Sequence, residues 1–163
     1  MKINIYTDGS SKGNPGRGGY GVIIKMKDEI IELSQGYRLT TNNRMELLAV
    51  IVGLEYIQEE NSLVLITSDS KYVIDSVVKG WVFNWEKKGF RKKKNQDLWK
   101  RFLVIYKKHN ISFKWIRGHS GHIENERCDQ LAVSASSNPP LKVDTFFEDT
   151  HKEPPNLFNG ELF

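Results

Sequence analysis

Polar and apolar residues alternate at the start of the chain with the two-residue period of a strand. In residues 2–7, isoleucine and threonine fall on one face and polar side chains fall on the other, so a strand is predicted that ends at Asp8. A glycine-rich loop is expected over residues 10–19, and residues 20–27 and 30–39 predict two further strands. Three strands joined by such short connections predict an antiparallel meander.

Helical segments alternate with two short strands in the rest of the chain. Residues 41–58 are rich in Leu, Met, Ala and Glu and are apolar around most of the helix circumference, which predicts a buried helix capped by Asn42 or Asn43. The apolar run 62–67 and the alternating run 111–116 predict strands. Further helices are expected at 70–78, 81–89, 97–109 and 124–136.

The order of these elements predicts an α/β fold with a mixed sheet. An antiparallel meander comes first, and right-handed crossovers then add the two later strands. Pro139-Pro140 ends the last predicted helix. We therefore expect a folded domain over residues 1–138 and a C-terminal tail over residues 139–163.

Composition excludes several classes of protein. The chain has 163 residues and a net charge of +4, and it contains neither an apolar run of membrane-spanning length nor the apolar stretch of a signal peptide. Its single cysteine, Cys128, cannot form an internal disulfide. A disulfide-stapled, collagen-like, disordered or membrane protein is thus disfavoured, and we expect a basic, cytoplasmic, single-domain protein.

The positive charge is concentrated in one segment. Residues 79–101 hold nine basic and two acidic side chains, net +7, together with five aromatic residues, whereas the acidic tail from residue 138 onward has a net charge of −3. Cations that neutralise phosphates beside rings that pack on sugars or bases suit nucleic-acid binding. A solvated basic face whose aromatic residues pack the helices is the alternative.

Four carboxylates are expected near one end of the sheet. Asp8 and Asp69 follow two predicted strands, Glu46 lies early in the helix between them, and Asp129 lies near the start of the last helix. Clustered carboxylates repel one another unless cations neutralise them, and an all-oxygen ligand set suits Mg²⁺ or Mn²⁺. Each acid could instead be a turn, capping or solvent-facing residue, and spacing alone leaves both interpretations open.

Several motifs, in order and at matching spacing from about Lys2 to Asn138, resemble those of a known family. They are TDGS at 7–10, GNPG at 13–16, TNNRMEL at 41–47, TSDS at 67–70, and GHSGH at 118–122 followed by ENERCD at 124–129. The chain is similar to bacterial type-1 ribonuclease H. The resemblance implies the ribonuclease H-like fold, a five-stranded mixed sheet flanked by helices. It also implies a metal-dependent endonuclease that cuts the RNA strand of RNA–DNA hybrids, leaving 5′-phosphate and 3′-hydroxyl ends.

The resemblance also implies roles for individual residues. Asp8, Glu46, Asp69 and Asp129 would hold two Mg²⁺ ions, with Mn²⁺ as an alternative, and Asp8 would bridge them. One ion would activate the attacking water, and the other would stabilise the departing 3′-oxygen. His119 would assist proton transfer or product release.

Substrate contacts are implied at further positions. Asn14, Asn42 and Asn43 would meet the minor groove, although turn and cap chemistry remains an alternative for them. Thr41 and Asn95 would hold a phosphate of the DNA strand. The segment 79–101 matches the basic handle of bacterial members, and Trp81 and Trp85 match its tryptophans. Lys71 stands where a substrate-contacting glutamine is common, and Leu39 where many members have an arginine.

Some questions stay open at this stage. Two Leu-Phe pairs near the end of the tail suggest either a motif for a replication partner, such as a sliding clamp, or a segment that folds back over an apolar patch or edge strand. A disordered end is the third alternative. A non-catalytic hybrid-binding module is the alternative function, and a related nuclease with another substrate is a third. The resemblance implies a monomer.

Overall fold

A single mixed sheet organises the molecule, as expected. The computed structural model describes residues 2–151, and its five strands lie in the order β3-β2-β1-β4-β5. The antiparallel meander consists of β1 (Lys2–Lys12), β2 (Gly16–Met26) and β3 (Glu29–Thr40). The crossover strands β4 (Leu63–Ser68) and β5 (Asn110–Trp115) pair in parallel beside β1. The predicted α/β fold class is therefore confirmed.

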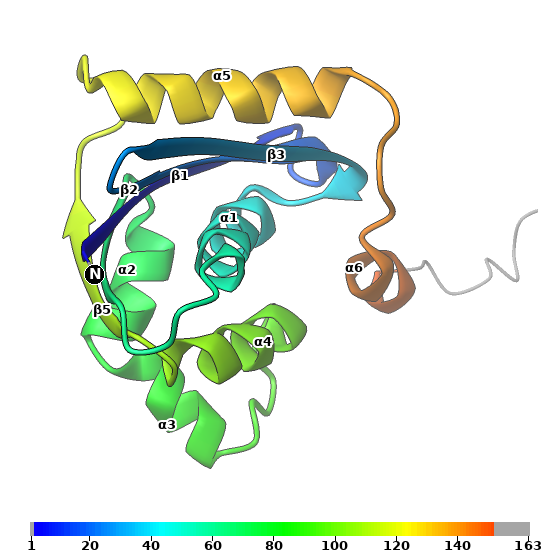
Figure 1. Ribbon diagram of the computed structural model, residues 1–163. Coiled ribbons are helices and arrows are strands. Elements are labelled where there is room, and N and C mark those ends of the chain that lie inside the picture. Colours follow the sequence, from blue (N-terminus) through cyan, green and yellow to red (C-terminus); the bar gives the residue numbers. More distant parts are fainter. Residues whose placement is uncertain (1, 152–163) are drawn as a thin grey trace, which may run out of the picture.

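Helices cover both faces of the sheet. They are α1 (Asn42–Tyr56), α2 (Lys71–Val78), α3 (Trp81–Lys87), α4 (Gln96–Tyr106), α5 (Ile123–Ser137) and α6 (Thr145–Thr150). In Figure 1, α5 lies along one face and α1 lies on the other, with α4 beyond α1. Within residues 2–151, no helix is long and apolar enough to cross a membrane.

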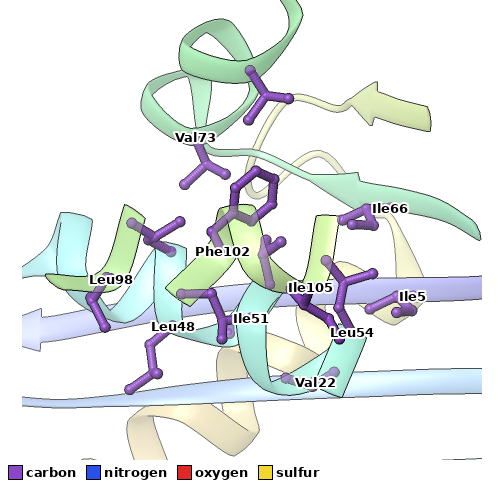
Figure 2. Packing of buried hydrophobic residues seen from close by; sticks show 14 of the residues in the cluster. Ile5, Val22, Leu48, Ile51, Leu54, Ile66, Val73, Leu98, Phe102 and Ile105 are labelled. Carbon is purple, nitrogen blue, oxygen red and sulfur yellow. The ribbon is translucent and has the colours of Figure 1, made fainter. Parts of the chain in front are cut away.

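The main hydrophobic core surrounds α1, which is enclosed by the sheet and α4. Ile51 and Leu54 of α1 meet Ile5 and Val22 of the sheet, and Phe102 of α4 packs with them (Figure 2). All five side chains are fully buried. Because α1 contacts protein on most sides, it lacks a polar face, which explains its nearly uniform apolar sequence.

Two local predictions differ from the structure. β1 continues past Asp8 to Lys12, because Ser10 and Ser11 pair with Gly19 and Gly18 across the hairpin, so most of the expected glycine-rich loop is strand. The N-cap of α1 is Thr41 rather than an asparagine: its Oγ1 accepts a hydrogen bond from the Arg44 N–H at 3.3 Å.

Residues beyond the last predicted helix fold back on the sheet. The Lys142 N–H donates to Gly36 O, and the Arg38 N–H donates to Lys142 O, both at 2.9 Å, so this segment pairs with the outer edge of β3. The unpredicted helix α6 follows and anchors itself through Phe147, which is 4% exposed. The part of the tail up to residue 151 therefore covers an edge strand. The two Leu-Phe pairs lie outside the described residues.

Candidate active site and nucleic-acid interface

The four predicted carboxylates line one cavity of about 450 Å³. Asp8 lies on β1, Glu46 on α1, Asp129 on α5, and Asp69 follows β4 directly. One carboxylate oxygen from each of Asp8, Glu46 and Asp69 lies within 4.8 Å of the others. The predicted site residues that line this cavity are Asp8, Asn42, Asn43, Glu46, Asp69, Lys71, His119 and Asp129.

A close approach of α1 to β1 positions Glu46. A Cβ on Gly9 would collide with the backbone of Met45 and Glu46, so only glycine allows this packing. The Gly9 N–H donates to Glu46 Oε1, and Asn42 Nδ2 donates to Gly9 O at 3.3 Å. The start of α1 is therefore fixed against the residue that follows Asp8 in the chain.

Contacts from the end of β5 position Asp69. The indole Nε1 of Trp115 donates to the Asp69 carbonyl oxygen at 3.0 Å, and the Lys71 ammonium lies 4.7 Å from the centre of the same ring. A Cβ on Gly118 would lie 2.6 Å from Asp69 Oδ2, so glycine leaves room for the carboxylate. Sequence reasoning missed Trp115, whose position at the end of a strand next to the carboxylate edge was the available signal.

Burial and mutual repulsion perturb the carboxylates. The pKa of Asp8 is raised from 3.8 to about 7, chiefly by desolvation on burial and also by the charges of Asp69 and Asp129, whereas a hydrogen bond with Glu46 opposes the rise. Burial and the neighbouring Asp8 raise the pKa of Glu46 well above its usual range. Among residues 2–151, no Lys or Arg forms an ion pair with any of the four carboxylates.

This donor set fits a hard divalent cation. Four carboxylates that lack a basic partner supply oxygen ligands, and the repulsion among them would be relieved by Mg²⁺ or Mn²⁺. The alternative roles do not account for Glu46 and Asp69. Glu46 is 4% exposed and is not a solvent-facing helix acid. The cap of α2 is Ser70, whose Oγ accepts from the Val73 N–H at 3.2 Å, and not Asp69.

The two loop histidines have different surroundings. His119 is exposed on the loop between β5 and α5, has a positive φ of 55°, and lines the carboxylate cavity. His122 is the N-cap of α5, where its Nδ1 accepts from the Asn125 N–H at 3.2 Å. Of this pair, only His119 lines the cavity.

A second cavity, of about 320 Å³, lies beside the N-terminus of α1. Asn14, Thr41, Asn43 and Asn95 line it, so it holds the other predicted polar contacts. Asn43 lines both cavities and therefore lies between them. The remaining lining residues are Arg44, Lys93, Lys94, Gln96, Phe146, Phe147, Thr150 and His151. The last four belong to α6 or its C-terminal end, which sequence reasoning missed although Asp144 before two phenylalanines resembles a helix start.

Arg44 joins three segments behind this second cavity. Its five N–H groups make five hydrogen bonds, at 2.7–3.3 Å, to carboxylate oxygens of Asp97 and Asp144 and to Asn95 Oδ1. Asp144 Oδ2 also accepts from Thr40 Oγ1 at 2.7 Å. The guanidinium is saturated by these partners and acts as a structural link between α1, α4 and α6.

The basic handle, residues 79–101, shows features of both a nucleic-acid-binding segment and a set of helices packed by aromatic residues. Trp81 and Trp85 line a third cavity, of about 250 Å³, with Asn84, Lys88, Arg91 and Lys93, and Trp81 is 44% exposed. Phe90 and Trp99, by contrast, are buried in the core. Phe83 and Trp85 are partly buried and pack against this core, whereas Trp81 is exposed. Both predicted tryptophans nevertheless line a cavity beside basic side chains.

Comparison with known proteins identifies one family. The family model described as RNase H matches residues 1–137. Ribonuclease H of Trichodesmium erythraeum is 52% identical over 152 residues, which cover 90% of this chain and 96% of that protein.

Solved structures agree with this match. LC9-RNase H1, a type 1 RNase H with the type 2 active-site motif, aligns with a TM-score of 0.73 and 30% identity over 83% of this chain and 72% of that chain. LC11-RNase H1 in complex with RNA/DNA hybrid aligns with a TM-score of 0.60 and 27% identity over 83% of this chain and 96% of that chain.

Proposed function

The chain belongs to the RNase H family of ribonucleases, and we propose that it hydrolyses the RNA strand of RNA–DNA hybrids at the carboxylate cavity. The observation that carries this proposal is the convergence of Asp8, Glu46, Asp69 and Asp129, from four separate elements, on one cavity. The related protein whose structure holds an RNA/DNA hybrid supports the choice of substrate.

The four carboxylates would hold the divalent cations. When bound, such ions activate a water for attack on phosphorus and stabilise the departing 3′-oxygen, which leaves 5′-phosphate and 3′-hydroxyl ends. Asp8 is the best candidate for a shared ligand, because each of the other three carboxylates perturbs its pKa. Gly9 and Trp115 keep Glu46 and Asp69 in place, so the site is preorganised by backbone contacts.

His119 would move a proton at the open side of the cavity or help the product leave. Its exposure and its place on the loop give the imidazole access to solvent and to substrate. The cluster of buried acids cannot easily take this role while it holds cations.

Each of the two neighbouring cavities would bind a different strand of the hybrid. The RNA strand would cross the carboxylate cavity, and a phosphate of the DNA strand would enter the second cavity, at Thr41 and Asn95. Asn43, which lines both, would face the minor groove between the strands together with Asn14 and Asn42. The handle, with Trp81 and Trp85, would bind the DNA backbone further along, and Lys71 would contact a phosphate.

A direct cleavage assay tests the proposal. The protein is incubated with labelled RNA–DNA hybrid, double-stranded RNA and double-stranded DNA, each with Mg²⁺, with Mn²⁺ and with chelator. We expect metal-dependent cutting of the RNA in the hybrid alone. Asp8→Asn, which keeps size but removes a charge, should lose cleavage by orders of magnitude and keep hybrid binding, whereas the exposed Asp28→Asn should cut normally.

Two other outcomes would each favour a different function. Tight hybrid binding without cutting in the wild type would favour a non-catalytic binding module. Cutting of another duplex would support the metal site but contradict the proposed substrate. The cytoplasmic location, the monomeric state and the replication partner stay predictions.

A further inference from the structure

Two segments far apart in the chain contribute to the lining of the second cavity. Lys93, Lys94 and Asn95 form a cationic and polar wall, and Phe146 and His151 contribute to the wall formed by α6. This C-terminal segment begins after residue 137, where the match to the family model ends. A segment outside the matched domain therefore completes a cavity that the proposed function assigns to the DNA strand.

Several independent contacts hold α6 in this position. Asp144 pairs with the buried Arg44 at 2.7 Å, and Glu148 pairs with Arg38 of β3 at 2.8 Å. Phe147 is buried beneath the helix, and Lys142 pairs with the strand edge. Because these contacts reach both α1 and β3, α6 is a fixed part of the fold next to the cavity.

The charged group behind the cavity, Arg44, already has hydrogen-bond partners within the protein. Arg44 gives all five of its N–H groups to Asp97, Asp144 and Asn95, so it cannot serve as the main phosphate ligand. Lys93 and Lys94 are exposed and line the cavity, so they carry the positive charge that a phosphate would meet, and the Lys93 ammonium also lies 5.2 Å from the centre of the Trp85 ring. Two acidic groups of the segment, Asp144 and Glu148, pair with Arg44 and Arg38, which lie outside the handle.

Phe146 adds an apolar surface to this cationic cavity. Its ring is partly buried, lies 5.6 Å from the Arg44 guanidinium carbon, and lines the cavity. An aromatic ring in the same cavity as two lysines suits a phosphate that carries a sugar better than it suits a free phosphate. A ribose packed there would bury its 2′-hydroxyl against carbon, which is costly without a hydrogen-bond partner, whereas a deoxyribose has only C–H groups at the 2′ position.

We propose that α6 is a substrate-binding element, in which Phe146 packs against a deoxyribose of the DNA strand while Lys93 and Lys94 hold the adjoining phosphate. The C-terminal segment thereby helps the protein to distinguish the DNA strand from the RNA strand. This inference rests on the proposed function, because it takes an RNA–DNA hybrid as the ligand.

Binding measurements in chelator test α6 without relying on cleavage. Fluorescence anisotropy would compare wild type, Phe146→Ala, Phe146→Leu and Val143→Ala with one labelled RNA paired either to DNA or to RNA. Val143→Ala is the matched control, because this exposed residue belongs to the same segment but does not line the cavity. Phe146→Leu keeps an apolar side chain over Arg44 if the alanine variant proves unstable.

We expect Phe146→Ala to bind the hybrid about tenfold more weakly and double-stranded RNA no more weakly than before, so that the preference for DNA falls. Phe146→Leu should lose part of the preference, and Val143→Ala should keep it. Unchanged binding of the hybrid, or an equal loss for both duplexes, would overturn the proposal. If the wild type binds hybrid and never cuts it, the proposed function fails while the comparison between variants still tests α6.

Discussion

Asp8→Asn should stabilise the metal-free protein, and the gain should depend on pH. The folded-state pKa of Asp8 is raised from 3.8 to about 7, chiefly by burial. Asp8 therefore binds a proton more tightly in the folded than in the unfolded protein. The stability that the protonated Asp8 contributes is fully present below pH 3.8 and is lost as the pH rises through about 7. The asparagine variant carries no such charge and does not suffer this loss.

The size of the effect follows from the shift in pKa. The shift is about 3 units, and at 1.36 kcal/mol per unit the ionised Asp8 costs the folded state about 4 kcal/mol above pH 7. This value is a ceiling, because the cluster can relax and admit water. We expect Asp8→Asn to gain about 2–4 kcal/mol at pH 8 and close to nothing below pH 4. For a chain of this length, each kcal/mol corresponds to about 2–4 °C in Tm.

Urea unfolding from pH 4 to pH 9, in chelator, measures the prediction. Asp28→Asn, at an exposed turn acid, serves as the control and should show no such pH-dependent gain. Adding Mg²⁺ at pH 8 should stabilise the wild type more than Asp8→Asn, because a bound cation relieves the same repulsion. A gain independent of pH, or an Asp8→Asn variant less stable than the wild type at pH 8, would refute the electrostatic reasoning.

Three other predictions concern groups around the site. Arg44→Met should destabilise the protein by about 3–5 kcal/mol in urea unfolding, because it leaves buried carboxylates unpaired. Arg38→Met, at an exposed ion pair, should cost under about 1 kcal/mol. Similar losses for the two variants would contradict the structural role of Arg44. The Cys128 thiol is buried, and burial raises its pKa. Iodoacetamide at pH 8 should therefore label it only after unfolding, and rapid labelling of the native protein would contradict this prediction. Trp115→Phe should raise the Mg²⁺ concentration needed for half-maximal cleavage, because it removes the indole hydrogen bond to the Asp69 backbone, and an unchanged metal titration would show that this contact does not position Asp69.

Local patterns predicted most of the architecture. Two-residue alternation and apolar runs located all five strands, and the uniformly apolar sequence of α1 indicated its burial. The motifs around Asp8, Glu46, Asp69 and Asp129 indicated which family the chain resembles. Each of these signals lies within one continuous stretch of the chain, where side-chain spacing and backbone preference decide the structure.

Tertiary structure decided the properties of the site. Gly9 and Glu46 are 37 residues apart in the chain, and Thr40 and Asp144 are 104 apart, yet each pair is joined by a hydrogen bond. The sequence indicated neither the α6 wall of the second cavity nor the bond from Trp115 to Asp69. Burial, pKa shifts and saturation of an arginine arise from groups that meet only after folding, because the loss of water and the approach of distant charges depend on every packed neighbour.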